Sequence, residues 1–145
     1  MRDKPTECGL LDTNLVIQLK HVDPNDLPNE PVVSVVTIAE LSVGPLVTDD
    51  EAERSARMAH LQQAEADFDP IAFDSSAARA FGRVAADLRH HGRKPAARAF
   101  DALIAATAIA NGLPLYTANP EDFAGITSLD LRPVEAAIPA AGSES

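Results

Sequence analysis

Four segments of this 145-residue chain carry side chains whose oxygen atoms could bind a metal ion. Asp12 follows a short apolar run, Glu40 lies one helical turn beyond a β-branched segment, and Asp101 lies near the start of an alanine-rich segment. Asn119 and Asp122 follow another apolar run. In sheets of parallel strands, ligands bind at the carboxyl ends of the strands. We therefore expect these side chains to meet at one edge of a sheet.

Each acid also has a simpler interpretation as part of a helix end. Asp12 could cap the helix after it, and Thr37 and Glu40 have the spacing of a capping box. Asp101 and Asp122 could be first-turn acids that the helix dipole favours. However, Asp101 is flanked by apolar residues on both sides, and an acid in a buried helix is rare unless it is paired or metal-bound.

Acids that do converge need a positive charge among them. Two carboxylates about 4 Å apart repel each other by roughly 4 kcal/mol at an effective dielectric constant of 20. Ligand sets made only of oxygen favour a hard cation such as Mg²⁺ or Mn²⁺. Such an ion can activate a water molecule and stabilise a phosphate under attack. The pattern thus indicates hydrolysis of phosphodiester bonds.

The elements that must position these acids alternate between strands and helices. The expected strands lie at residues 9–11, 32–36, 69–73, 113–117 and 129–131. The expected helices lie at residues 13–20, 37–43, 50–68, 74–91, 96–111 and 120–123. This order predicts a three-layer α/β/α fold with a central, mostly parallel sheet. We expect one domain at residues 1–135 and a flexible tail at 136–145.

Composition excludes several classes of protein. Twelve basic and twenty-two acidic residues give a net charge of −10 and an isoelectric point near 4.6, which argues against a general DNA-coating protein. The single cysteine, Cys8, excludes an internal disulfide and a multi-cysteine zinc site. The charged N-terminus lacks the apolar stretch of a signal peptide, and no apolar run is long enough to cross a membrane. We therefore expect a cytoplasmic protein.

The charge is unevenly distributed along the chain. Residues 79–98 contain six basic side chains and one acid, a net charge of +5, which leaves −15 for the remainder. Because this basic segment leads directly to Asp101, we interpret it as a binding surface for phosphate groups, with single-stranded or looped RNA as the target. The candidate phosphate-binding residues are Arg79, Arg83, Arg93, Lys94 and Arg98.

The acid-bearing segments resemble those of one protein family. They read Leu-Leu-Asp12-Thr-Asn, Val-Val-Thr-Ile-Ala-Glu40-Leu, Phe-Asp101-Ala-Leu-Ile-Ala-Ala-Thr-Ala and Leu-Tyr-Thr-Ala-Asn119-Pro-Glu-Asp122-Phe. In this order they resemble the PIN-domain nucleases, and among these the VapC toxins of bacterial toxin–antitoxin pairs. The resemblance covers residues 10–131, and its most specific part is the segment around Asp101.

The resemblance implies a metal-dependent endoribonuclease. The resemblance implies that Asp12, Glu40 and Asp101 surround Mg²⁺ or Mn²⁺. It also implies that Asp122 or Asn119 occupies the fourth catalytic position. A VapB-type antitoxin would hold the enzyme inactive in a hetero-oligomer. The resemblance also implies a homodimer. We expect its apolar surface among five side chains that one small core need not bury: Leu15, Ile38, Leu41, Val43 and Leu46.

Two other functions are compatible with the same residues. The chain could be a module that binds RNA or a partner without catalysis, and Asn119 in the fourth position gives this alternative some support. A phosphatase or phosphotransferase of the haloacid-dehalogenase type also begins with a motif like that at Asp12. That chemistry needs a second acid two residues later, and Asn14 stands there.

Overall fold

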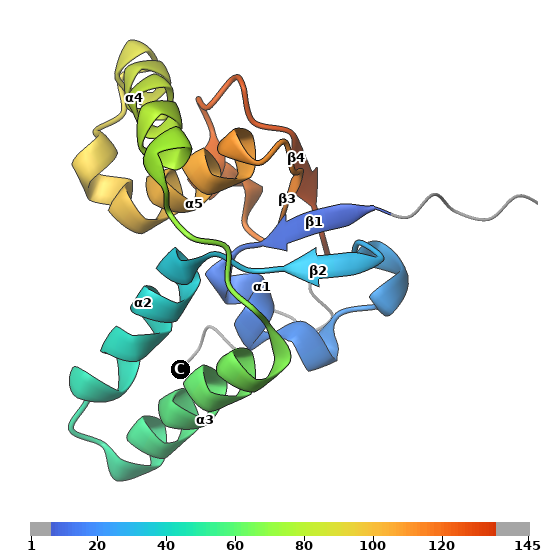
Figure 1. The fold of residues 1–145 in the computed structure, drawn as a ribbon. Helices are drawn as coiled ribbons and strands as arrows, with labels where there is room; N and C mark the ends of the chain where they lie inside the picture. The colour runs from blue at the N-terminus through green and yellow to red at the C-terminus, as the bar shows by residue number, and fades with distance from the viewer. Residues whose placement is uncertain (1–6, 136–145) are drawn as a thin grey trace, which may run out of the picture.

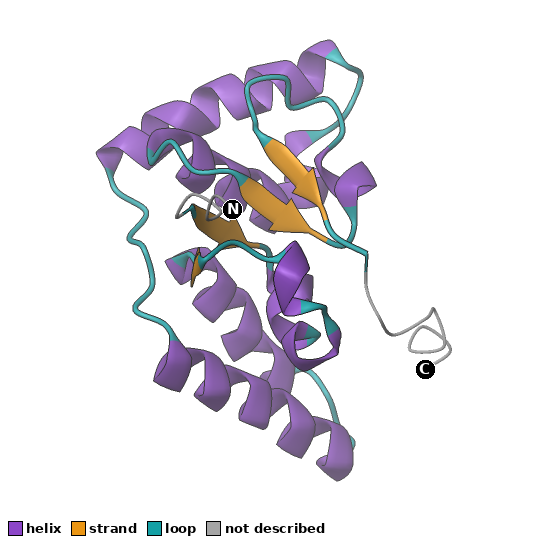
Figure 2. Ribbon diagram, turned by 90° about the vertical axis from the view of Figure 1, so that its right-hand side faces the viewer, coloured by secondary structure: helices purple, strands orange, loops and turns teal. Residues whose placement is uncertain are grey.

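The sheet that positions the candidate acids consists of four parallel strands. The computed structural model describes residues 7–135. The strands are β1 (Cys8–Leu11), β2 (Glu30–Val32), β3 (Leu115–Thr117) and β4 (Leu131–Pro133), in the spatial order β2-β1-β3-β4. Helices lie on both sides of it (Figures 1 and 2), so the predicted three-layer α/β/α fold is confirmed. The expected tail at 136–145 lies outside the described residues.

Four of the five α-helices in the described residues begin at a short polar side chain that caps them. The α-helices are α1 (Thr13–Ile17), α2 (Val35–Val43), α3 (Glu51–Asp67), α4 (Ser75–His90) and α5 (Ala99–Ala110). Short 3₁₀ turns are η1 (Leu19–His21), η2 (Pro24–Asp26), η3 (Gly44–Leu46), η4 (Pro95–Arg98) and η5 (Pro120–Phe123). Side chains that accept a backbone N–H cap the first four α-helices: Asp12, Ser34, Asp50 and Asp74. Among residues 7–135, no helix has both the length and the apolar character that crossing a membrane requires.

Two apolar clusters hold the helices against the sheet. Successive residues of a strand point to opposite faces, so Leu10 and Leu115 pack against α4 and α5, whereas Leu11 and Tyr116 pack with Leu15 of α1 on the other face. Gly9 allows the close approach of Tyr116, since a Cβ there would lie 2.5 Å from the ring. Both strands that precede candidate acids are therefore fixed from two sides.

Several expected boundaries are wrong. β2 ends at Val32, and α2 begins at Val35 because Oγ of Ser34 accepts the N–H of Val36 at 2.8 Å. The β-branched residues Val36 and Thr37 thus face the core from a helix, whereas Val35 is exposed. Residues 69–73 form only an isolated bridge between Ile71 and Ser34. The expected helix at 13–20 is divided into α1 and η1, and the expected helix at 96–111 into η4 and α5.

The apolar residues expected to face a second copy divide into two groups. Leu15 and Leu41 are buried in the protein, so their part of that expectation is wrong. Val43 and Leu46 are exposed by 44% and 81%, at the end of α2 and in η3. Ile38 is partly buried.

Candidate active site at the carboxyl edge of the sheet

Asp12 is fixed between two strands and a helix. It follows β1 directly and is only 4% exposed. Its Oδ1 accepts the N–H of Leu15 at 2.9 Å and so caps α1, while its Oδ2 accepts the hydroxyl of Thr117, at the end of β3, at 2.5 Å. The Thr117 hydroxyl in turn accepts the N–H of Asn119 at 2.9 Å. Asp12 therefore caps α1, as one interpretation predicted, and also lies at the carboxyl edge of the sheet, as the other predicted.

The pKa of Asp12 is raised to about 6. Burial is the main cause, because it removes water from the ionised carboxylate. The hydrogen bonds from Thr117 and Leu15 oppose this effect and lower the pKa, whereas the negative charges of Glu40 and Asp122 raise it. These two acids therefore lie near enough to interact with Asp12 electrostatically.

Asp101 belongs to the same group of acids. It stands in the first turn of α5, and its pKa is raised to about 6, first by burial and then by the charges of Asp122 and Glu40. Asp12 raises it further, and Arg98 lowers it. The structure thus brings the four acids predicted from the sequence into one electrostatic group, although they are up to 110 positions apart in the chain. Figure 1 shows the arrowheads of β1 and β2 pointing to the side where α2 and α5 begin.

Glu40 contributes a carboxylate oxygen that lacks a partner. It lies on α2, and its Oε1 is buried without a hydrogen-bond partner among the described residues. Thr37 lies inside α2, which Ser34 caps, so the capping-box interpretation of Glu40 is wrong. The hydroxyls of Thr13 and Thr37, 3.0 Å apart, join α1 to α2 beside it. A buried polar atom without a partner is rare in proteins, and a bound water or ion is one of the explanations for it.

Arg98 is the basic side chain that enters this group. Its Nη1 lies 2.7 Å from Oδ1 of Asp122 and 3.7 Å from Oδ2 of Asp101. The sequence placed Arg98 among the phosphate-binding residues, but here the two carboxylates already engage its guanidinium. Of the ion pairs in residues 7–135, those that reach the four acids come from Arg98 alone.

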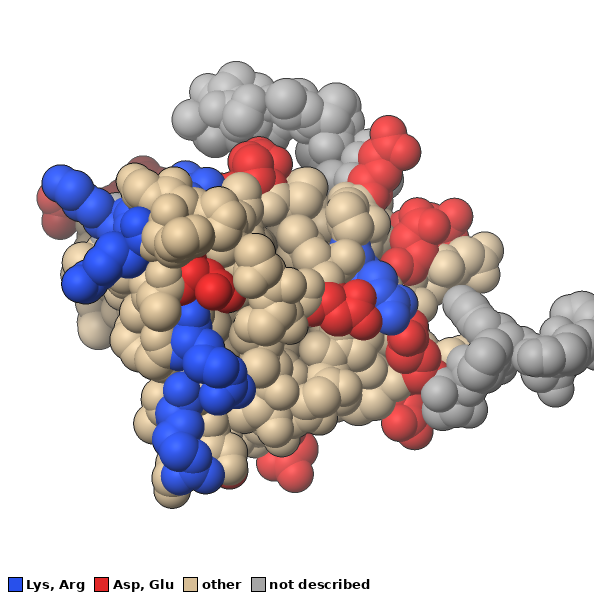
Figure 3. Space-filling view, turned by 90° about the horizontal axis from the view of Figure 1, so that it is seen from above, with Lys and Arg blue, Asp and Glu red and all other residues tan. Residues whose placement is uncertain are grey.

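The other predicted basic residues line α4 and the segment after it. Arg79 and Arg83 are exposed on α4, Lys94 is exposed before η4, and the stem of Arg93 packs over Gly125. In Figure 3, which looks down on the α4 side of the molecule, Lys and Arg side chains gather along one side of the surface. These residues therefore form an exposed basic surface.

The donor atoms fit a divalent cation. Asp12, Glu40, Asp101 and Asp122 supply carboxylates, Asn119 could supply an amide oxygen, and the partnerless Oε1 of Glu40 is a free ligand atom. Within residues 7–135, no three acidic, histidine or cysteine side chains already stand at direct ligand spacing. Mg²⁺ commonly binds through one or two carboxylates and several waters, so a preformed cage of three is not required. The fit is thus to a hydrated hard cation.

Two hydroxyl contacts of the site are not predicted by the sequence. Thr117 binds Asp12 across the sheet, and Thr13 pairs with Thr37. The signal for Thr117 was its place at the end of an apolar strand, two residues before Asn119. No sequence signal shows that its hydroxyl bonds to an acid more than 100 positions away.

Comparison with known proteins identifies the family. The PIN domain family model matches residues 10–127 of the chain, which include all four acids. The chain belongs to the PIN-domain family. A relative from Mycobacterium tuberculosis (strain H37Rv), named Ribonuclease VapC5, is 35% identical over 122 residues, which are 82% of this chain and 87% of that protein. The predicted family is therefore confirmed.

Solved structures share this PIN-domain fold. VapBC-5 of Mycobacterium tuberculosis, a member of the VapBC family of toxin–antitoxin systems, superposes with a TM-score of 0.75 at 32% identity and covers 90% of this chain and 100% of its own. VapBC2 from Rickettsia felis, bound to a DNA fragment from its promoter, gives a TM-score of 0.72 at 25% identity and covers 88% and 99%. Both comparisons agree with the parallel sheet and its flanking helices.

Proposed function

We propose that this PIN-domain chain is a metal-dependent endoribonuclease and the toxin of a toxin–antitoxin pair. The observation that carries the proposal is the group of four acids at the carboxyl edge of the sheet. Burial and mutual repulsion raise the pKa of both Asp12 and Asp101 to about 6, and Oε1 of Glu40 has no partner. Displaced pKa values of this kind cluster at functional sites. The ribonuclease name of the relative supports RNA as the substrate.

The residues have distinct proposed roles. Asp12, Glu40 and Asp101 hold Mg²⁺ or Mn²⁺, and Asp122 or the amide of Asn119 occupies the fourth position. The bound ion would activate a water molecule and stabilise the charge that develops on the phosphate. The hydroxyl of Thr117 keeps the Asp12 carboxylate in place at the end of β1. Well above a pH of about 6, Asp12 and Asp101 are ionised and available to a cation.

The basic surface gives RNA a way to reach an otherwise acidic protein. Arg79, Arg83, Arg93 and Lys94 would contact phosphate groups, which binds RNA without reading its sequence. The net charge of −10 makes a local positive surface necessary, because the rest of the chain repels a polyanion. Weaker RNA binding at higher salt concentration is the expected signature.

A protein partner is part of the proposal. The similar structures are complexes of toxin–antitoxin systems, which supports a VapB-type antitoxin that covers this site. We also propose a homodimer, for which the exposed Val43 and Leu46 supply apolar surface. Size-exclusion chromatography of the chain with and without the antitoxin tests both assemblies. A chain that stays monomeric and does not co-elute would contradict them.

The second candidate function is binding without catalysis. Asn119 in the fourth position and the ion pairs of Arg98 with Asp101 and Asp122 favour it, because both reduce the negative charge available to a cation. The two functions differ in one respect that can be measured, since a binding module leaves RNA intact in the presence of any metal ion.

The deciding experiment is RNA cleavage by the purified chain. Single-stranded RNA should be cut in the presence of Mg²⁺ or Mn²⁺ and remain intact with a chelator. The Asp12→Asn variant keeps an oxygen for the cap of α1 but removes the charge, and it should be inactive in either metal. Cleavage that persists in the chelator or in this variant would contradict the proposal, and intact RNA throughout would favour the binding module.

A further inference from the structure

One positive charge already stands among the four acids. Arg98 precedes α5 by one residue, so its side chain and that of Asp101 lie three positions apart on neighbouring turns. From there Nη1 reaches Oδ1 of Asp122, which belongs to η5, at 2.7 Å. The guanidinium therefore lies between two carboxylates that come from different elements.

We propose that Arg98 is an internal counter-cation that competes with the divalent metal ion for Asp101 and Asp122. The inference rests on the proposed metal-dependent function, and it assigns Arg98 a regulatory role instead of the phosphate contact expected from the sequence. In the metal-free protein Arg98 screens the two acids from each other. Occupation of the site by the metal ion requires the guanidinium to leave.

The charges make simultaneous occupation unfavourable. A divalent ion ligated by Asp101 would lie close to a guanidinium that is now 3.7 Å from the same carboxylate, and the two positive charges would repel each other. The Asp122 oxygen that accepts from Arg98 at 2.7 Å offers fewer free lone pairs to a metal ion or to its bound water. Both effects make Arg98 a competitor of the cation.

The contacts of Arg98 are suited to release. Its side chain is 41% exposed, so it can move to water without uncovering apolar core. Both of its ion pairs use the same nitrogen, Nη1, whereas paired parallel hydrogen bonds are the arrangement that holds an arginine firmly. Arg132 at the other end of the sheet shows that firm arrangement, with Nε and Nη2 both on Asp130.

Metal affinity tests the competition directly. Isothermal titration with Mn²⁺ would compare the wild-type chain, Arg98→Gln and Arg89→Gln, a matched loss of one charge at an exposed position of α4 that touches none of the four acids. Arg98→Gln should bind Mn²⁺ about threefold to tenfold more tightly than wild type, and Arg89→Gln should change the affinity by less than about twofold. Unchanged or weaker binding by Arg98→Gln would overturn the inference.

A second measurement uses the wild-type chain and does not depend on how a variant folds. In the arginine side-chain NMR spectrum, the Nε–H signal that is missing from Arg98→Lys identifies Arg98. This signal should shift when Mg²⁺ is added to the wild-type protein, and it should stay in place in Asp101→Asn. A signal that does not respond to Mg²⁺ in a protein that binds Mg²⁺ would overturn the inference.

The two proposals fail in different ways. If wild-type protein binds neither Mn²⁺ nor Mg²⁺, the metal-dependent function fails and the competition fails with it. If wild-type protein binds the metal and Arg98→Gln binds it equally well, only the role of Arg98 fails. Tighter binding by Arg98→Gln together with a metal-sensitive Arg98 signal supports both.

Discussion

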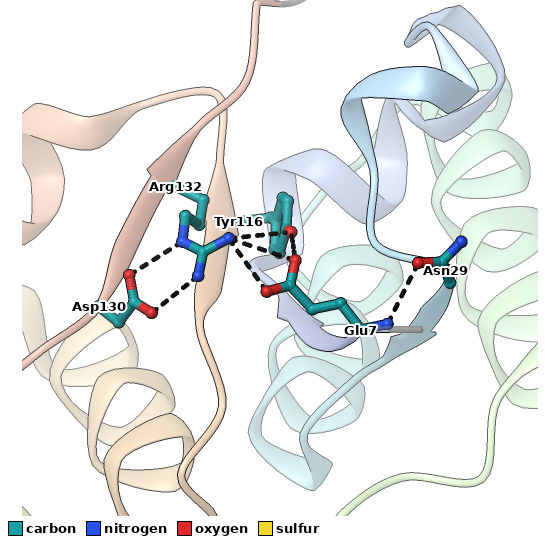
Figure 4. A network of polar contacts seen from close by, with 5 residues as sticks. All are labelled: Glu7, Asn29, Tyr116, Asp130 and Arg132. Atoms are coloured by element: carbon teal, nitrogen blue, oxygen red, sulfur yellow. Dashed lines mark hydrogen bonds and ion pairs between the residues drawn. The ribbon is translucent and has the colours of Figure 1, made fainter. Parts of the chain in front are cut away.

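The two ends of the same sheet treat acidic side chains in opposite ways. At the amino end, Glu7 and Asp130 precede β1 and β4, and Arg132 binds both of them (Figure 4). At the carboxyl end, Asp12 follows β1 and Asp101 lies in the first turn of α5, and a single arginine, Arg98, pairs with two of the four acids there. The same strands thus connect acids that are each paired with a basic side chain to a group in which, among the described residues, Asp12 and Glu40 have no such pair.

The amino-end network satisfies its charges. Arg132 donates from Nε and Nη2 to Asp130 at 2.9 and 3.0 Å and from Nη1 to Glu7 at 3.2 Å. The Tyr116 hydroxyl also donates to Glu7, and the N–H of Glu7 donates to Asn29 at 3.1 Å. The hydrogen bonds from Arg132 and Tyr116 keep the pKa of Asp130 and of Glu7, respectively, below their usual values. These acids are stable when ionised.

Two of the carboxyl-end acids, Asp12 and Asp101, are destabilised when ionised. Burial and, to a lesser extent, the neighbouring acids together raise the pKa of both to about 6. Hydrogen bonds from Thr117 and Leu15 oppose this shift at Asp12, and the charge of Arg98 opposes it at Asp101. One sheet therefore contains acids that stabilise the fold at one end and acids suited to chemistry at the other, and the partners of each carboxylate distinguish the two kinds.

The largest difference should appear in RNA cleavage. Asp101→Asn removes a proposed metal ligand and should lower the cleavage rate by on the order of 10²-fold or more, as loss of a key electrostatic group does in other active sites. Asp130→Asn removes the same charge at the opposite end and should leave the rate within about twofold. Rates on one RNA substrate under saturating Mg²⁺ measure both. Equal losses in the two variants would show that the ends do not differ in function.

The same variant, Asp101→Asn, should have a smaller effect on stability, and there it should be a gain instead of a loss. The pKa of folded Asp101 is about 6, against 3.8 as the ordinary value, so its ionised form weakens the fold near neutral pH. Asp101→Asn should therefore raise the free energy of unfolding by about 1–3 kcal/mol in the presence of a chelator. The gain should shrink as the pH falls through 6 and vanish below about 4, where the carboxyl group is protonated in both states. Urea unfolding across this range gives the result, and a less stable variant would contradict the account.

The smallest expected effect is the change in stability caused by Asp130→Asn at the amino end of the sheet. Because the pKa of Asp130 is lowered in the folded protein, its charge adds stability above the ordinary pKa, and this is lost as the pH falls through the folded value. The side chain is more than half exposed, so water screens the pair and Asp130→Asn should cost less than about 1 kcal/mol near neutral pH. Thermal unfolding would detect this loss. If Asp130→Asn were more stable than the wild-type chain, the acids at the two ends would not differ in their effect on stability.

The acids of the candidate site can be predicted from the sequence because their positions follow from local patterns. Asp12 and Asp122 come after apolar strands, and an acid such as Asp101 in an apolar helix is conspicuous. The parallel topology then brings them to one edge. The sequence also predicted the layers and most helices, since helical periodicity and caps are local signals.

The remaining features depend on contacts between distant segments. Glu7 and Arg132 are 125 positions apart, and nothing in either segment indicates that they pair. The end of β2 was misplaced because Val35 and Val36 favour a strand by composition, while the cap at Ser34 begins a helix there. The sequence groups Arg98 with the phosphate-binding residues because it lies in the basic segment. Its short distance from Asp122 arises only in the folded chain, so the sequence does not reveal it. Tertiary contacts decided each of these cases.

Metal binding at the two ends tests the central claim most directly. Calorimetric titration with Mn²⁺ near neutral pH would compare the wild-type chain, Asp101→Asn and Asp130→Asn. We predict that the wild-type protein and Asp130→Asn bind Mn²⁺ with equal affinity, and that Asp101→Asn binds it at least about tenfold more weakly. Equal affinity in Asp101→Asn, or no binding by the wild-type chain, would contradict the account.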